Sequence, residues 1–324
     1  MYQKLDEVIN IDYNNRGIHY LYDVNKELYD VPVMEKAVNL INKIEENKFI
    51  FLTTGSVTRS WVSTNIGETD GPLGTAVLAK KLREYKNVIP IILTEESLIE
   101  TTKPVLRAAG FAVVSPEEAL SANDNSNKGY TSVVCLLPYT DENESAVSCA
   151  ESLLNKYKPA AIFSIEKAGR TDNNTYHNMR GHDYSHGRAR VDYMFEIAKE
   201  RGIPTLGIGD GGNEIGMGNI KNVVKEKINY GENLACKVKT DVLITTSVSN
   251  WGCYAICAAI ALQSGDIKYL HTSEDERRIL ESAVLSGHVD GATGKAETTV
   301  DGLSLQANTA IIELLKAIVM KNIK

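Results

Sequence analysis

Apolar residues fall into two kinds of segment that alternate along most of the chain. Short, nearly continuous apolar runs predict buried strands, and they occur at residues 49–53, 88–93, 111–114, 132–137, 160–165, 203–208 and 242–245. Apolar residues at helical spacing predict amphipathic helices at residues 33–47, 75–83, 96–109, 145–157, 190–200, 252–263, 273–285 and 309–320. Because the strands have no polar face and mostly alternate with helices, the pattern predicts an α/β fold: a mostly parallel sheet with helices on both faces.

The N-terminal part of the chain has a different pattern. It is polar and rich in tyrosine before the helical spacing at 33–47 begins. We therefore predict a helical N-terminal arm over residues 1–47 and a single α/β catalytic domain over residues 48–324. Within that domain, Pro104 should kink the helix at 96–109 or begin a new turn, and the polar stretch 121–129 should be a loop.

Composition narrows the class of protein. The 324 residues are 43% hydrophobic, enough for a sizeable core, and carry a net charge of −7 without a basic stripe, which argues against nucleic acid as a partner. No apolar run is long enough to cross a bilayer, and the N-terminus resembles neither a signal peptide nor a transit peptide. The five cysteines are scattered, without zinc or disulfide spacing. We expect a cytoplasmic protein with free thiols and no membrane partner, and the composition leaves a homo-oligomer open.

A glycine-rich segment at residues 205–219 follows one of the predicted strands. Its larger polar side chains are Asp210, Asn213 and Glu214. Residues 207–212 spell G-x-G-x-x-G, but no strand follows in the place that a dinucleotide site requires. A capped turn without chemistry is a second interpretation. The third, which we favour, is an oxygen-rich site for a polar substrate or a divalent metal ion (Mg²⁺ or Mn²⁺), with Asp210 and Glu214 as metal ligands.

The segment after the first predicted strand has the composition of an anion-binding loop. It presents hydroxyl groups and backbone N–H groups, and a guanidinium lies close by. These features predict a carboxylate or phosphate site formed by Thr54, Gly55, Ser56 and Arg59. The loop lacks the Gly-Lys-Ser/Thr ending of a nucleotide-binding P-loop.

Three further polar segments are candidates for the same site. Asp70 and Gly71 could bind an ammonium group, or Asp70 could simply cap the next helix. Asn250 and Trp251 precede a small-residue helix and could line a pocket, although a core tryptophan is equally consistent with the sequence. The glycine-rich segment 287–302 contains two aspartates and could form a lid.

The segment 166–190 has the highest density of titratable residues. Glu166 and Lys167 end an apolar strand, where burial can shift a pKa, although an ordinary ion pair would also explain them. His182 and His186 are four residues apart, but the glycines around them indicate a loop, so a metal pair competes with a solvated loop.

Several unusual stretches resemble the D-glutamate cyclase family. They are residues 163–185 and 207–219, supported by residues 53–60 and 67–74, and the likeness extends over most of the chain from about residue 49. The chain is similar to the stand-alone bacterial form of the family. The resemblance implies a carbon–oxygen lyase that closes D-glutamate into 5-oxo-D-proline and expels water, with an acidic amino acid as its substrate and no organic cofactor.

This reaction needs a base for the ammonium, a neutralising charge for the attacked carboxylate, an acid for the departing oxygen and an anchor for the other carboxylate. The first hypothesis is that the loop at Thr54–Arg59 anchors the α-carboxylate, and that Asp210, Glu214 or Asn213 receives the ammonium or a metal ion. Neutralisation is assigned to Lys167 with Arg170, and proton transfer to Glu166, Asp183 or His182.

This hypothesis requires that Glu166–Arg170 and Asp210–Glu214 face each other across one crevice. Two alternatives share the same residues: a metal-dependent hydro-lyase or hydrolase acting on another small carboxylic acid, and a non-catalytic protein that binds acidic amino acids.

Overall fold

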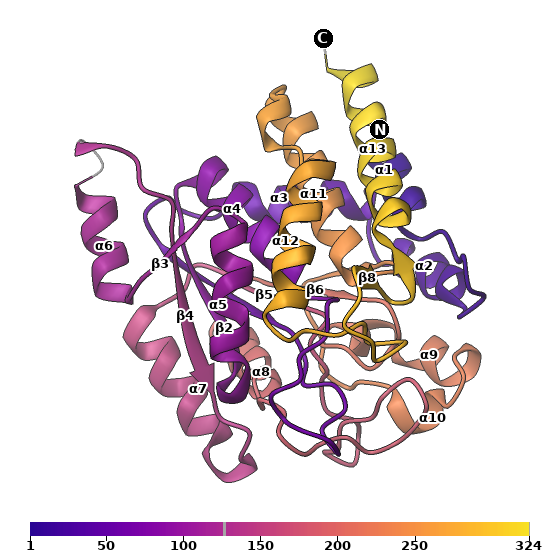
Figure 1. Ribbon diagram of the computed structural model, residues 1–324. Helices are drawn as coiled ribbons and strands as arrows, with labels where there is room; N and C mark the ends of the chain where they lie inside the picture. Colours follow the sequence, from indigo (N-terminus) through magenta and orange to yellow (C-terminus); the bar gives the residue numbers. More distant parts are fainter. Residues whose placement is uncertain (126–127, 324) are drawn as a thin grey trace.

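A seven-stranded sheet forms the centre of the molecule (Figure 1). The structure is a computed structural model that describes residues 1–125 and 128–323. The strand order is β3-β4-β2-β1-β5-β6-β7, and every neighbouring pair is parallel. The strands are β1 (Phe49–Thr54), β2 (Ile89–Glu95), β3 (Ala112–Val113), β4 (Val133–Tyr139), β5 (Ile162–Ile165), β6 (Thr205–Gly209) and β7 (Val242–Thr245). A short antiparallel pair, β8 (Thr299–Val300) and β9 (Leu303–Ser304), lies outside this sheet.

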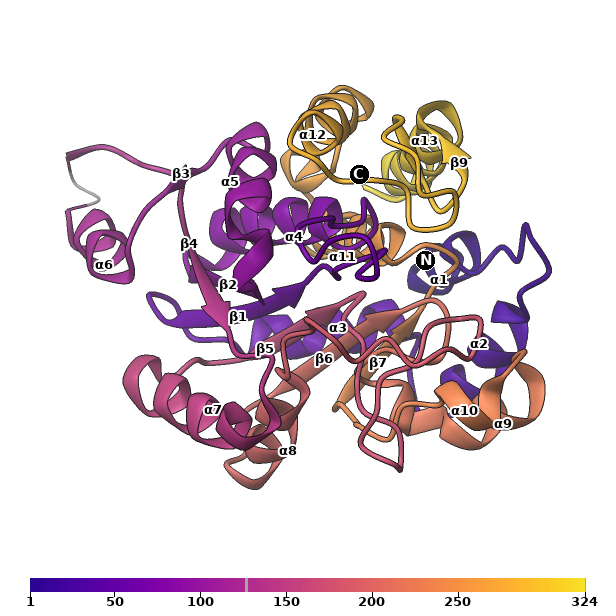
Figure 2. The same cartoon turned by 60° about the horizontal axis from the view of Figure 1, so that its bottom comes forward.

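Helices cover both faces of the sheet, which confirms the α/β prediction (Figure 2). One face is covered by α1 (Tyr2–Ile9), α3 (Val33–Asn42), α4 (Pro72–Lys86), α5 (Ile99–Ala108) and α11 (Ser249–Ser264), with α12 (Ser273–Leu285) and α13 (Leu305–Asn322) outside them. The other face is covered by α2 (Ile18–Lys26), α6 (Pro116–Asp124), α7 (Asn143–Tyr157), α8 (Asp192–Glu200), α9 (Lys221–Lys227) and α10 (Gly231–Leu234). Both faces of the central strands are therefore buried, as their continuous apolar runs indicated.

The chain reverses its direction of travel across the sheet between β1 and β5. From β1 it proceeds through β2 to the β3–β4 edge, and it then returns to β5 on the other side of β1 and continues to β7. In open parallel sheets, the carboxyl ends of the strands at such a switch point form a ready-made crevice for ligands. The loops after β1, β5 and β6 leave the sheet at this edge.

The N-terminal arm packs onto the same core as the rest of the chain. Leu5 and Ile9 of α1 and Met34 of α3 are buried in the cluster that contains α11 and α13. The boundary at residue 47 stays a prediction. Among the described residues, no helix is both long enough and apolar enough to cross a membrane.

Two local predictions need correction. Pro104 lies inside α5, and the segment 96–109 divides earlier, into a single 3₁₀ turn (Glu96–Leu98) and then α5. Helix α6 extends through Asp124 into the stretch 121–129 that was predicted to be a loop, because Ser115 and Glu118 form a capping box that starts it. Residues 126 and 127 of that stretch lie outside the described residues.

Candidate active site

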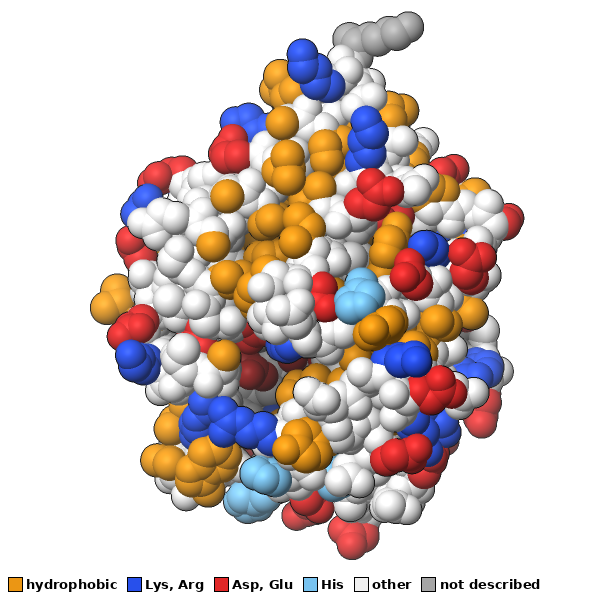
Figure 3. Space-filling model, turned by 90° about the vertical axis from the view of Figure 1, so that its right-hand side faces the viewer, with side chains coloured by type: hydrophobic (Ala, Val, Ile, Leu, Met, Phe, Trp, Pro, Cys, Tyr) orange, Lys and Arg blue, Asp and Glu red, His pale blue; other side chains and the backbone are white. Residues whose placement is uncertain are grey.

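A cavity of about 300 Å³ lies at the switch point. Its lining comes from the loops after β1, β5 and β6, from residue 16 of the arm and from the C-terminal segment 287–302. On the face shown in Figure 3 the surface is hollowed, with acidic side chains inside the hollow and basic side chains at its edge. The same mixture of charges lines the cavity: Arg16, Arg59, Glu68, Glu166, Arg180, Arg188, Asp210 and Asp301.

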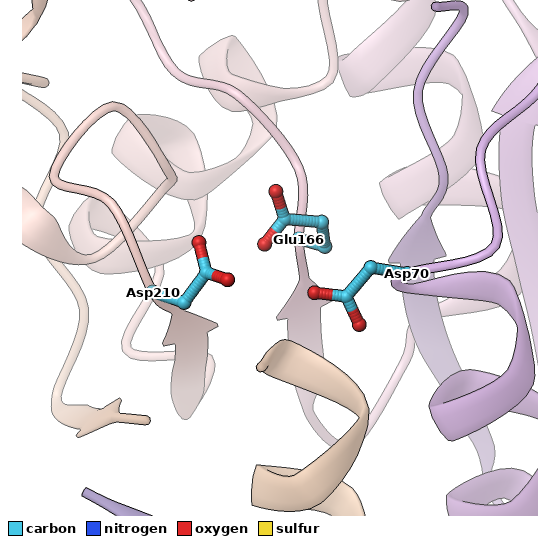
Figure 4. Close-up of side chains that lie close together, drawn as sticks. All are labelled: Asp70, Glu166 and Asp210. Atoms are coloured by element: carbon cyan, nitrogen blue, oxygen red, sulfur yellow. The ribbon is translucent and has the colours of Figure 1, made fainter. Parts of the chain in front are cut away.

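Three carboxylates lie close together beside the cavity, and Glu166 and Asp210 of these line it, whereas Asp70 does not. Asp70, Glu166 and Asp210 each offer an oxygen within 4.8 Å of the others (Figure 4). They come from the loops after β1, β5 and β6, so the parallel sheet brings them together although they are far apart in sequence. Glu166 has a left-handed backbone (φ 54°), a strained state for a non-glycine residue that is found most often at functional sites.

Asp70 is held in place by a reciprocal pair of helix caps. Its carboxylate accepts hydrogen bonds from the N–H groups of Ser249 and Asn250 at the start of α11 (both 2.8 Å). In return, Asn250 Oδ1 accepts from the N–H groups of Gly71 (3.0 Å) and Gly74 (2.7 Å) at the start of α4. Asp70 therefore caps α11 and not the helix that follows it, and Asn250 orders the loop instead of lining the cavity.

Glu166 is oriented by Ser249, whose hydroxyl donates to Glu166 Oε2 at 2.6 Å. Its other carboxylate oxygen makes no hydrogen bond to a described residue. Gly71 leaves the space that this arrangement needs, because a Cβ at that position would lie 2.9 Å from Glu166 Cβ. Glu166 thus has one anchored oxygen and one available for a ligand.

Glu214, predicted as a metal ligand, instead forms hydrogen bonds within its own loop. Its carboxylate accepts from the N–H groups of Asp210 (3.3 Å), Gly211 (2.9 Å) and Gly212 (2.8 Å). It does not line the cavity. The carboxylates that lie close enough to share an ion are those of Asp70, Glu166 and Asp210. Of the two metal ligands predicted from the sequence, Asp210 belongs to this group and Glu214 does not.

Arg16, in the N-terminal arm, bridges Asp210 and Asp301. Arg16 Nη2 donates to Asp210 Oδ2 (3.0 Å) and to the carbonyl of Ser247 (2.8 Å), while Nη1 donates to Asp301 Oδ2 (3.3 Å). Asp301 lies in the C-terminal segment 287–302, so this segment packs against the cavity, and its role as a lid stays a prediction.

Burial and mutual repulsion raise the pKa of each carboxyl in the cluster. Burial raises the pKa of Asp70 to about 7, and the charge of Asp301 acts in the same direction. Burial also raises the pKa of Asp210 to about 7, although the guanidinium of Arg16 opposes the shift. The pKa of Glu166 lies well above its ordinary value, because of burial and then of Asp210 and Glu214. A cluster of this kind favours a bound proton or a bound cation.

The cavity wall also contains Arg188, Tyr184 and Asn213. Arg188 is buried, stacks 3.4 Å from the centre of the Tyr184 ring and donates from Nε to the Tyr184 carbonyl (2.8 Å). Asn213 Nδ2 donates to the Tyr184 hydroxyl (2.9 Å). The predicted residue Asn213 therefore lines the cavity and supports its basic wall.

Lys167 and Arg170, the predicted neutralising pair, do not line the cavity. Lys167 forms a buried ion pair with Glu95 at the end of β2. Arg170 donates to Asp192 (2.7 Å) and Glu196 (2.6 Å) of α8. Successive side chains after a strand point in different directions, and Glu166 alone of this group points into the cavity.

The predicted anion loop is only partly at the cavity. Thr54, Gly55 and Ser56 are buried beneath it and do not line it. Arg59 does line it, but its Nη2 donates to the carbonyls of Gly291 (3.0 Å) and Ala292 (3.4 Å). Its guanidinium therefore holds the C-terminal segment over the cavity.

The histidine-rich part of the segment 166–190 is exposed. His182 lies at the rim of the cavity, and Asp183 faces away and accepts from the backbone and hydroxyl of Ser185 (2.9 and 2.6 Å). His186 does not line this cavity. His182 and His186, the candidate metal pair, line different cavities, and among the described residues neither belongs to a group of three or more close metal-binding side chains.

Five charged residues of the cavity were not assigned catalytic or binding roles of their own from the sequence: Arg16, Glu68, Arg180, Arg188 and Asp301. The sequence contained some indication of Arg188 and Glu68, because both lie in polar segments that follow predicted strands, where a site was expected. Arg16 reaches the cavity from the N-terminal arm, and the hydrophobic pattern contains no signal for that contact. Asp301 lies in the glycine-rich segment 287–302, which was a candidate lid.

The fold and site define a class: an α/β protein with a charged, amino acid-sized cavity at the switch point of a parallel sheet. A family model described as D-glutamate cyclase-like, C-terminal, matches residues 5–316. The chain therefore belongs to the D-glutamate cyclase-like family. It is also 28% identical over 274 residues to the human mitochondrial D-glutamate cyclase, a match that covers 80% of this chain and 38% of the human protein. The match thus extends over well under half of that relative's length.

Proposed function

We propose that the protein is a D-glutamate cyclase-like lyase that converts D-glutamate into 5-oxo-D-proline and water. The observation that carries the proposal is the presence of both kinds of charge at one small cavity: Glu166 and Asp210 line it with Asp70 close beside them, and arginines line it too. This arrangement suits a molecule with an ammonium group and carboxylates. The volume of about 300 Å³ is at the small end of the range for small-molecule sites (~300–1,000 Å³). The family and the name of the human relative support the same reaction.

In this mechanism the substrate ammonium lies among Asp70, Glu166 and Asp210. Glu166 acts as the base, because one of its carboxylate oxygens is free and because burial raises its pKa, which makes it a stronger proton acceptor. The amine nitrogen then attacks the side-chain carboxyl carbon. Two protons leave the nitrogen, and two protons reach the departing oxygen, which leaves as water. The cavity also folds the substrate so that the nitrogen lies close to this carbon, which lowers the barrier to ring closure.

A divalent metal ion is the second candidate for the place between the three carboxylates. Three oxygens within 4.8 Å of one another can share one ion, and oxygen donors of this kind suit Mg²⁺ or Mn²⁺. Bound there, the ion would supply a positive charge to polarise the substrate carboxylate. Dialysis against a chelator, followed by titration with each ion, tests this candidate by activity and by the ion's own binding isotherm.

The reaction is tested by incubating purified protein with D-glutamate and, separately, L-glutamate, and by detecting 5-oxoproline on a chiral column. We expect 5-oxo-D-proline from D-glutamate, and little from the Glu166→Gln variant. If D-glutamate binds and no product forms, the protein is a binder of acidic amino acids. If another small carboxylic acid is turned over in a chelator-sensitive way, it is a metal-dependent hydro-lyase or hydrolase. Either result removes the cyclase proposal.

The cytoplasmic location expected from the sequence and the oligomeric state are not fixed by the fold. The human relative is named as mitochondrial. Fractionation of the source cells and light scattering on the purified protein would determine each property.

A further inference from the structure

One buried arginine in the cavity wall has terminal nitrogens without partners. Arg188 is 3% exposed, and its Nη1 is buried with no hydrogen-bond partner among the described residues. Its Nε donates to the Tyr184 carbonyl, and no bond to a described residue is made by Nη2. Buried donors are nearly always satisfied, so a guanidinium left in this state inside a cavity indicates an anion that completes it.

The fold holds this guanidinium rigidly. Its plane lies 3.4 Å from the centre of the Tyr184 ring, and the Tyr184 hydroxyl is in turn fixed by Asn213. A hydrogen bond to the Tyr184 carbonyl and a stacking contact with the Tyr184 ring restrain the side chain before any ligand binds. Preorganised donors in a dry site stabilise developing negative charge far better than donors that must first reorient.

Among the described residues, no carboxylate forms an ion pair with Arg188. The charge of Arg188 acts to lower the pKa of Glu68, which burial raises, but no hydrogen bond or ion pair joins the two side chains. The other cavity arginines are occupied: Arg16 is paired with Asp210 and Asp301, and Arg59 binds the segment at Gly291. Arg188 is therefore the buried cation of the cavity that is free for a substrate.

We propose that Arg188 binds the carboxylate that is attacked and stabilises the oxyanion formed from it, the role that the sequence had suggested for Lys167. This proposal rests on the cyclase function proposed above. When the nitrogen lone pair forms the C–N bond, the carbonyl electron pair moves to an oxygen held by the Arg188 guanidinium. That pair returns as the C–O bond to the departing water breaks. Arg188 keeps its protons throughout and supplies charge and geometry alone.

The depth of the residue supports this choice of carboxylate. The charge of the attacked carboxylate must be neutralised before the nitrogen can add to it, and a buried cation does this more effectively than an exposed one because the surroundings screen it less. Arg180, in contrast, is exposed at the rim and is better placed for the carboxylate that does not react.

Arg190 offers a matched control two residues away. It is also buried, its guanidinium lies 4.5 Å from the Tyr176 ring, and its Nε and Nη2 donate to the carbonyls of Asp141 and Ser185. It does not line the cavity. Replacing either arginine removes a stacked, buried guanidinium from the same segment, but only Arg188 should affect the substrate.

The test compares Arg188→Met, Arg188→Lys and Arg188→Ala with Arg190→Met. We expect kcat for D-glutamate to fall by roughly 10²–10³ in Arg188→Met, as for the loss of an oxyanion-hole donor. Lysine should recover part of this loss, since it restores the charge without the planar fork. Roughly 20 mM guanidinium, well below denaturing concentrations, should raise the rate of Arg188→Ala at least tenfold and leave Arg190→Met unchanged. Rescue requires a folded site, so a misfolded variant cannot mimic it.

Dissociation constants of two ligand fragments identify which carboxylate is bound. 4-Aminobutyrate keeps the attacked carboxylate and lacks the α-carboxylate, whereas D-2-aminobutyrate keeps the α-carboxylate and lacks the other. Arg188→Met should weaken 4-aminobutyrate at least tenfold and change D-2-aminobutyrate less than threefold. The opposite pattern, equal effects on both, or normal turnover without Arg188 would overturn the proposal. If wild-type protein forms no 5-oxoproline from D-glutamate, the proposed function fails instead, and the fragment constants still report the anion site.

Discussion

Replacing Lys167 by methionine should mainly destabilise the protein and leave its chemistry largely intact. The Lys167 ammonium is buried against Glu95, and it also donates to the Thr54 carbonyl (3.4 Å). It thus ties together the carboxyl ends of β5, β2 and β1 beneath the cavity. Burial lowers the pKa of Lys167, and the charge of Glu95 opposes that shift. Removing the lysine leaves Glu95 buried without its cation.

The magnitude follows from the loss of one partner of a buried pair, which costs about 3–5 kcal/mol. Unfolding entropy of about 2.1 cal/mol/K per residue, applied to 324 residues, gives roughly 0.7 kcal/mol/K. The Tm should therefore fall by roughly 4–7 °C. A second substitution, Glu95→Gln, removes the stranded charge and should restore part of the loss.

The assay is thermal and denaturant unfolding of Lys167→Met, with turnover measured at a temperature where the variant is folded. Lys156→Met is the control, because Lys156 is exposed and its pairing with Glu117 is loose (3.6 Å). We expect kcat of Lys167→Met within about tenfold of wild type, below the 10²–10⁴ that a proton-transfer group contributes. A stability change under about 1 kcal/mol together with a hundredfold loss of kcat would refute this reasoning and return Lys167 to catalysis.

Three further predictions concern other parts of the molecule. Glu166→Gln should lower kcat by roughly 10²–10⁴ with little change in Tm; retained turnover would exclude Glu166 as the base. Glu214→Gln should cost about 1–3 kcal/mol in urea unfolding, because its carboxylate accepts three backbone N–H groups; an unchanged midpoint would contradict the loop-ordering role. Burial raises the pKa of Asp6 to about 7, above its unfolded value of 3.8, so its contribution to stability is complete below pH 3.8 and declines up to about pH 7. In Asp6→Asn this part of the pH dependence should disappear, and an unaltered profile would argue against a shifted Asp6.

The strands and the approximate place of the site were predictable from the sequence for a simple reason. Buried parallel strands are continuous apolar runs, and their carboxyl ends meet at one edge, so polar residues after β5 and β6 had to lie near each other. Glu166 and Asp210 are close for this reason, whereas Lys167, Arg170 and Glu214 of the predicted crevice do not line the cavity.

The direction of each side chain was not predictable in the same way. Glu166 and Lys167 are adjacent, and sequence alone does not determine which one faces the cavity and which one pairs with Glu95. Glu214 looked like a ligand because it is acidic in a glycine loop, yet those bare backbone N–H groups are what bind it. In both cases the contact that fixes the side chain is made by a residue distant in sequence or by the backbone, and the hydrophobic pattern of the sequence does not predict such contacts.

Arg16 joins the beginning of the chain to Asp301, near its end. A shortened protein starting at residue 20 would retain all seven strands of the main sheet. It would lose Leu5 and Ile9 from the core and the arginine that pairs with Asp210. A purification tag or fused domain at either terminus lies close in sequence to residues that shape the cavity. An inactive tagged sample should therefore first be compared with an untagged one.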